Sequence, residues 1–118
     1  MKQGTVLVEK SYLFSIRVVK LYQHLSTAKK EYILAKQILR SGTSIGANIF
    51  ESQYAQSKKD FVSKLYISFK ESNETEYWLM LLRDTGYIKP DEFENMLLDL
   101  VELKKLLVSI IKTSKANS

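Results

Sequence analysis

Residues 41–48 read Ser-Gly-Thr-Ser-Ile-Gly-Ala-Asn and lie inside a stretch that otherwise has the pattern of one long helix. Each glycine in a helix interior costs about 1 kcal/mol relative to alanine. A continuous helix through Gly42 and Gly46 therefore requires a close packing contact that compensates for this cost. The alternative is a loop at residues 41–48 that separates two shorter helices.

The composition predicts a single all-α domain over residues 1–118. The chain has one proline and four glycines, whereas a sheet needs frequent turns rich in these residues. Hydrophobic residues make up 45% and aromatic residues 11% of the chain, which is enough for a real core. The absence of cysteine excludes disulfides, thiolate zinc sites and thiol nucleophiles.

The sequence predicts a soluble cytoplasmic protein with a basic first half. No apolar leader follows Lys2, and the longest apolar stretches, such as residues 106–111, are too short to cross a bilayer. The net charge of +5 is unevenly divided. Residues 1–59 carry 10 basic and 3 acidic side chains, whereas residues 60–118 carry 8 and 10.

Apolar periodicity and end signals predict four helices. They cover about residues 6–25, 28–55, 58–85 and 90–112. Their end signals are Ser26 or Thr27 and the Ser57/Asp60 pair as amino-terminal caps, Gly86 as a carboxy-terminal stop, and Pro90 in a first turn.

The first of these helices carries apolar residues on two sides. One stripe consists of Phe14, Val18, Leu21 and Leu25, and the other of Tyr12, Ile16, Val19 and Tyr22. A surface helix in a small monomeric bundle needs only one apolar stripe. The second stripe therefore predicts a homo-oligomer.

A tight turn near Gln56 predicts that the second and third helices run antiparallel, with the numbers of facing residues summing to about 113. In this register Ile45 is expected to lie opposite Ser68, and the glycines of the second helix are expected to line a seam of small residues that includes Ser72 of the third helix. Glu76, near the core face of the third helix, is expected to pair with Arg40 or Gln37, because a carboxylate there needs a partner.

Three motifs carry a resemblance to a known family. Residues 37–49 read Gln-Ile-Leu-Arg-Ser-Gly-Thr-Ser-Ile-Gly-Ala-Asn-Ile, residues 57–61 Ser-Lys-Lys-Asp-Phe, and residues 71–79 Glu-Ser-Asn-Glu-Thr-Glu-Tyr-Trp-Leu. Their order and spacing resemble the four-helix-bundle family encoded in intervening sequences of bacterial 23S rRNA genes. Phe50 departs from the family, which commonly has a basic or polar residue there, and is expected to enlarge an apolar contact surface.

The resemblance implies an antiparallel up-down-up-down bundle that assembles into a five-membered ring. It also implies a similarity to the accessory protein of diversity-generating retroelements, a basic pentamer that binds nucleic acid and a reverse transcriptase.

The titratable residues predict no catalytic or metal site. The only histidine, His24, follows Leu21 by three residues, which excludes the Glu-x-x-His pairs of di-iron bundles. Glu71, Glu74 and Glu76 have no identifiable pocket or partner for acid–base chemistry and are interpreted as a structural polar network. We therefore expect no enzyme activity, no cofactor and no small-molecule substrate.

Basic residues gather on the first two helices. Lys10, Arg17 and Lys20 cluster on the first, and Lys29, Lys36 and Arg40 fall within about 40° on the wheel of the second. Such stripes suit phosphate backbones, whose binding energy comes largely from counterion release. We expect a binding or scaffold protein that contacts structured RNA or DNA.

Three alternative readings of the basic stripes stay open. They can form an ordinary solvated face, or dock on the acidic half of a neighbouring subunit. The chain can also be a protein-interaction scaffold, such as an accessory subunit for a reverse transcriptase, without direct nucleic-acid binding.

Overall fold

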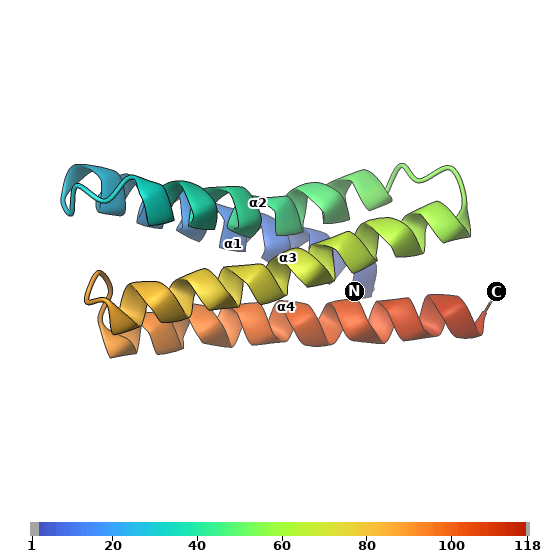
Figure 1. The fold of residues 1–118 in the computed structure, drawn as a ribbon. Helices are drawn as coiled ribbons and strands as arrows, with labels where there is room; N and C mark the ends of the chain where they lie inside the picture. Colours follow the sequence, from blue (N-terminus) through green and yellow to red (C-terminus); the bar gives the residue numbers. More distant parts are fainter. Residues whose placement is uncertain (1–2, 118) are drawn as a thin grey trace.

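The computed structural model describes residues 3–117 and folds them into four helices joined by short connections (Figure 1). The helices are α1 (Gln3–Thr27), α2 (Ile33–Ser52), α3 (Lys58–Asp84) and α4 (Pro90–Ala116). Each helix contacts two others, in the cyclic order α1, α2, α3, α4. The bundle measures 47 × 23 × 22 Å. The expected all-α class is confirmed, since no strand occurs in this part of the chain.

The second helix begins at Ile33 rather than near residue 28. The expected caps, Ser26 and Thr27, do not start it because both belong to the last turn of α1. Glu31 takes their place. Its Oε1 accepts hydrogen bonds from the backbone N–H groups of Leu34 (2.6 Å) and of the next residue (3.1 Å). The sequence pattern missed this start because glutamate is not among the residues typical of helix caps.

The other end signals lie where the sequence predicts them. The Ser57 hydroxyl accepts a hydrogen bond from the backbone N–H of Asp60 at 3.0 Å and caps α3. Gly86 follows the end of α3 with a φ of 84°, a conformation that glycine adopts without strain. Pro90 is the first residue of α4. These ends were predictable because each signal acts within a few residues of itself.

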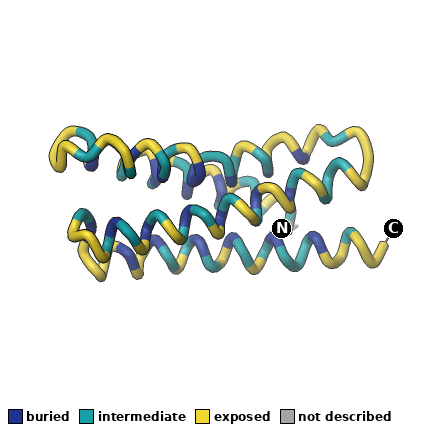
Figure 2. The backbone as a smooth tube through the Cα atoms, viewed as in Figure 1, coloured by how far each residue is buried: buried dark blue, intermediate teal, exposed yellow. Residues whose placement is uncertain are grey.

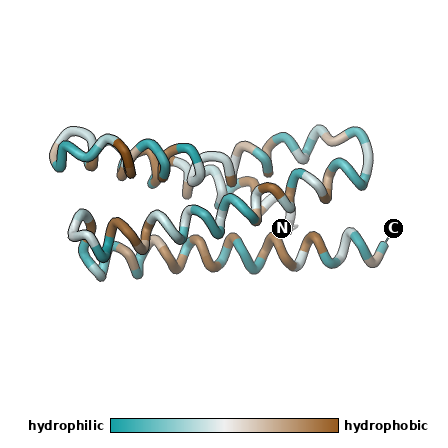
Figure 3. Tube along the Cα trace, in the orientation of Figure 1, coloured by the Kyte–Doolittle hydropathy of each residue, from teal (hydrophilic) through white to brown (hydrophobic). Residues whose placement is uncertain are grey.

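The core is a row of apolar side chains along the inner side of every helix. Figure 2 shows buried residues recurring along the helices and exposed ones gathering at the connections, and Figure 3 shows apolar and hydrophilic residues alternating along α4. The large, fully buried side chains include Phe14, Leu25, Ile38, Ile45, Ile49, Leu65, Leu79, Leu82, Leu100, Leu103 and Leu107. Burying each contributes about 1.5–3 kcal/mol. No helix within residues 3–117 has the length and apolar content needed to cross a membrane.

Small polar residues form the contact between α2 and α3. The Ser68 hydroxyl donates a hydrogen bond to the carbonyl of Ile45 at 2.9 Å, and the Thr75 hydroxyl donates to the Ser41 hydroxyl at 3.0 Å. Both hydrogen bonds are buried. The expected pairing of Ile45 with Ser68 is confirmed. A residue earlier in α2, Ser41, pairs with a residue later in α3, Thr75.

α2 is continuous through residues 41–48, so the loop alternative is wrong. The expected glycine seam with α3 is also wrong, because the glycines face α1. A Cβ atom added to Gly42 would lie 2.7 Å from Cγ1 of Val18, and one added to Gly46 would lie 2.8 Å from Oγ of Ser15. Neighbouring helix positions are rotated by about 100°. Ser41 of α2 therefore contacts α3, whereas Gly42, the next residue, contacts α1.

Replacing Gly42 by alanine is expected to lower the free energy of unfolding, although alanine favours a helix by about 1 kcal/mol. The added methyl group would overlap Val18, a stiff and fully buried side chain. Overpacking of this kind costs about 1–3 kcal/mol. The measurement is urea unfolding followed by circular dichroism.

Gly4→Ala is the matched control for this variant, because nothing lies within 4 Å of its added Cβ. It should be at least as stable as the wild type. A Gly42→Ala protein as stable as this control would contradict the close approach of α1 and α2.

Candidate nucleic-acid interface

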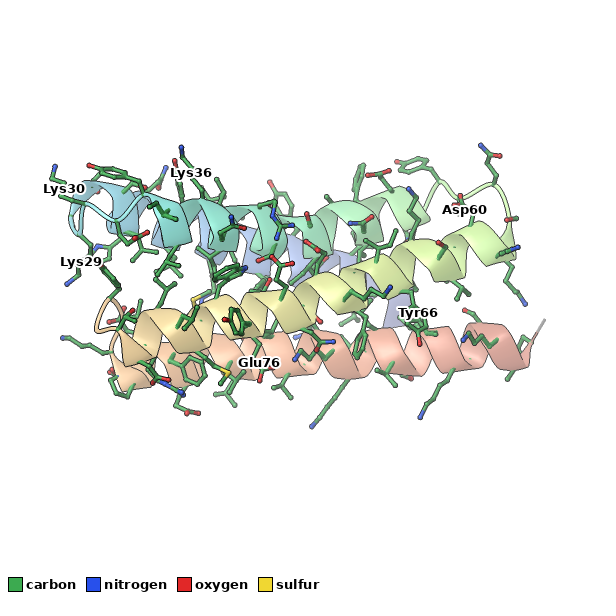
Figure 4. The ribbon with its side chains drawn as sticks, in the orientation of Figure 1. Lys29, Lys30, Lys36, Asp60, Tyr66 and Glu76 are labelled. Atoms are coloured by element: carbon green, nitrogen blue, oxygen red, sulfur yellow. The ribbon has the colours of Figure 1, made fainter. Side chains whose placement is uncertain are left out.

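Three exposed lysines surround the connection between α1 and α2, at one end of the bundle (Figure 4). Lys29 and Lys30 lie in the connection, and Lys36 lies in the first turn of α2. Within residues 3–117, none of the three forms an ion pair with a carboxylate. We call these three residues the lysine cluster. Their charges are available to an anionic partner.

Backbone hydrogen bonds hold this connection in a defined shape. The N–H groups of Ala28 and Lys29 both donate to the carbonyl of His24, at 2.9 and 3.3 Å. The N–H group of Glu31 donates to the carbonyl of Leu25 at 2.9 Å. The lysine cluster is therefore carried on an ordered turn, which limits the entropy lost when it binds.

Lys30 has a φ of 55°, in the left-handed region that favours glycine. A residue with a Cβ atom adopts this conformation at a cost of roughly 1–2 kcal/mol. A lysine kept in such a position is a functional candidate. Sequence reasoning placed residue 30 inside a helix and missed it. The available signal was the consecutive pair Lys29-Lys30 close to a helix end.

Lys20 is exposed on α1 and lines an open cavity of about 560 Å³ between α1 and α4. Exposed His24 lines the same cavity. Asp91 and Glu92 of α4 also line it. These carboxylates oppose phosphate binding, so Lys20 contributes less to an anion surface than the lysine cluster.

Arg17 pairs with α4 and does not stand free in solvent. Its guanidinium donates to Oδ2 of Asp99 and to Oδ1 of Asn95, both at 2.6 Å. Lys10, on the same stripe, lies 2.9 Å from Glu102, whose hydrogen bond raises the pKa of the lysine. The stripe predicted on α1 is therefore largely neutralised by acids from the second half of the chain.

Arg40 is held by α3, but by different acids from the one expected. It donates to Oε2 of Glu71 at 3.1 Å and also bonds Glu74, which accepts a hydrogen bond from the indole N–H of Trp78 at 2.9 Å. We call Arg40, Glu71, Glu74 and Trp78 the Arg40 network.

The expected pairing of Glu76 with Arg40 or Gln37 is wrong. Glu76 pairs with Lys104, because it lies on the side of α3 that faces α4 (Figure 4). Within residues 3–117, no group of three or more acidic or histidine side chains is arranged to hold a metal ion. The chemistry that the surface offers is charge-based binding of anions by lysine ammonium groups.

Comparison with known proteins finds one matching family and a similar crystal structure. The family model described as 23S rRNA-intervening sequence protein matches residues 4–109. A similar crystal structure is that of a protein with unknown function from the S23 ribosomal protein family of Bacteroides thetaiotaomicron VPI-5482. It is 52% identical, with a TM-score of 0.93, and the match covers 94% of this chain and 99% of that chain. No curated protein matches the chain.

Replacing Arg40 by alanine is expected to lower the free energy of unfolding by about 1 kcal/mol. The Glu71 side chain is only 18% exposed and would lose its charged partner. Thermal and urea unfolding measure the effect. Lys36→Ala, one turn earlier on α2 and without an ion-pair partner in the described residues, should change stability very little. Equal stability of the two variants would show that the Arg40 network does not support the fold.

Proposed function

We propose that this chain, which belongs to the family of 23S rRNA-intervening sequence proteins, is a cytoplasmic, non-enzymatic protein that binds structured RNA or DNA. The observation that carries this proposal is the lysine cluster. Lys29, Lys30 and Lys36 are exposed together at one end of the bundle and lack acidic partners within residues 3–117. The family name supports an association with RNA.

The lysine cluster fits the phosphate backbone better than it fits base edges. Lysine ammonium groups act as point charges, whereas reading a base edge needs paired donors and acceptors in a fixed geometry. Phosphate contacts release counterions and carry no sequence information directly. The proposed activity is therefore binding to a shape or a charge density rather than to a sequence.

A homo-oligomer is part of the same proposal, in the form of a ring of five antiparallel up-down-up-down bundles. The second apolar stripe of α1 supports it, because Tyr12 is 67% exposed, and Ile16 and Val19 are each 37% exposed. Apolar surface of this kind marks contacts with other molecules. Repetition of a weak basic patch around a ring would also raise its affinity for one long phosphate backbone.

A second candidate function is a scaffold for another protein. Tyr32 and Ile33 favour it, because they lie beside the lysine cluster and are 53% and 76% exposed. Apolar side chains among lysines also suit a protein partner with an acidic rim. Salt separates the two functions, since binding through phosphates weakens steeply as salt rises and binding through an apolar contact responds little.

The double variant Lys29→Glu/Lys36→Glu is expected to weaken binding to structured RNA roughly tenfold or more at physiological salt. The slope of log affinity against log salt should fall by about one for each phosphate contact that is lost. Mobility-shift titrations at several salt concentrations measure both quantities, and light scattering should show unchanged assembly.

Lys105→Glu/Lys112→Glu is the matched control, because it makes the same charge change at two exposed positions of α4. It should keep most of the RNA affinity. Equal losses in both double variants would attribute binding to net charge alone. A wild-type protein without salt-sensitive binding to RNA or DNA would refute the nucleic-acid function.

A further inference from the structure

An apolar groove runs along the outside of the bundle between α1 and α2. It has a volume of about 650 Å³ and is lined by small residues that include Ser15, Gly46 and Ala47. Tyr12 and Phe50 also line it and are 67% and 58% exposed. Gly46 contributes no side chain to the groove, at a point where its backbone lies close to Ser15 of α1. We call this surface the α1–α2 groove.

Two carboxylates give the α1–α2 groove a negative charge. Glu9 and Glu51 are both exposed and both line it. Glu51 has one distant partner, Lys64, at 3.4 Å, and Glu9 forms no ion pair within residues 3–117. An occupant of this groove must therefore combine apolar side chains with positive charges.

The first half of α3 presents such a surface. Tyr66 and Ile67 are 44% and 43% exposed. Lys59 lies two turns before Tyr66, and Lys70 lies one turn after it, so these side chains share one face of the helix. Both lysines are exposed, and neither forms an ion pair among the described residues. We call this surface the α3 face.

We propose that the α1–α2 groove of one copy of this chain receives the α3 face of a second copy. Tyr66 and Ile67 would pack against Tyr12 and Phe50, and the lysines of the α3 face would lie near Glu9 and Glu51. This contact deepens the homo-oligomer of the proposed function and rests on it, but it does not depend on nucleic-acid binding.

The positions of the two surfaces determine the kind of assembly. The α1–α2 pair and the α3–α4 pair lie on opposite sides of the bundle in the cyclic order of contacts. When two copies join through different surfaces, one copy keeps a free α3 face and the other a free groove, so the contact repeats from copy to copy and can close into a ring.

The two surfaces also lie in the same half of the bundle, away from the lysine cluster. Figure 4 shows Tyr66 toward one end and Lys29, Lys30 and Lys36 toward the other. Rotation about an axis along the bundle would then join neighbouring copies at the same level. All lysine clusters would lie on one rim of the ring, where their charges act together on one polyanion.

A charge-exchange experiment tests this contact by light scattering at micromolar protein. Glu9→Lys/Glu51→Lys and Lys59→Glu/Lys70→Glu each place like charges across the contact. Each double variant should therefore raise the dissociation constant of the assembly roughly tenfold or more. The quadruple variant restores opposite charges and should recover the mass of the wild-type assembly. Circular dichroism and thermal melting establish that all variants are folded.

Glu94→Lys/Lys105→Glu is the control for the quadruple variant, because it exchanges charges between two exposed residues of α4 and, like that variant, leaves the net charge unchanged. It should leave assembly unchanged. Folded double variants that keep the wild-type mass, or a folded quadruple variant that does not recover it, would overturn the proposed contact. So would a wild-type protein that stays monomeric, whatever other protein it binds. An assembled wild type without RNA binding would remove the nucleic-acid function and leave the contact supported.

Discussion

The close approach of α1 to α2 at Gly42 and Gly46 is the constraint on which the packing of α2 and the α1–α2 groove depend. Val18 and Ser15 of α1 occupy the space in which side chains of α2 would otherwise stand. This contact determines how α2 is rotated about its axis, and hence that Ser41 meets α3. At Gly46 the missing side chain serves a second purpose, because it opens the α1–α2 groove.

The positive charge of the first half of the chain is divided into a neutralised part and a free part. Acids of α3 and α4 pair with Lys10, Arg17 and Arg40, three cations that face neighbouring helices. Lys29 and Lys30 escape this pairing because they lie in the connection, beyond the side faces of the bundle. The net charge of the chain is therefore a poor guide to its anion surface, and position at the end of the bundle is a better one.

The sequence predicted the core stripes and the helix ends at Ser57, Gly86 and Pro90, because each of these signals acts on its immediate neighbours, but it missed the start of α2 at Ile33. It failed where the partner of a residue depends on helix rotation. The acidic partner of Arg17 is 82 residues away in the sequence and that of Arg40 is 31 residues away. No local sequence pattern identifies which acid pairs with either arginine. In the candidate site, Lys29 and Lys36 were predicted to be exposed, but Lys30 was missed because the connection that carries it was read as helix.

Ultraviolet cross-linking of the wild-type protein to a structured RNA, followed by mass spectrometry of the peptides, tests whether the lysine cluster contacts RNA. Cross-links should concentrate at residues 28–36, which contain the lysine cluster and the exposed ring of Tyr32. The α1–α2 groove should remain free of cross-links because a second copy covers it. Cross-links that concentrate on Tyr12 and Phe50, with none at residues 28–36, would refute both RNA binding by the lysine cluster and the covering of the α1–α2 groove by a second copy.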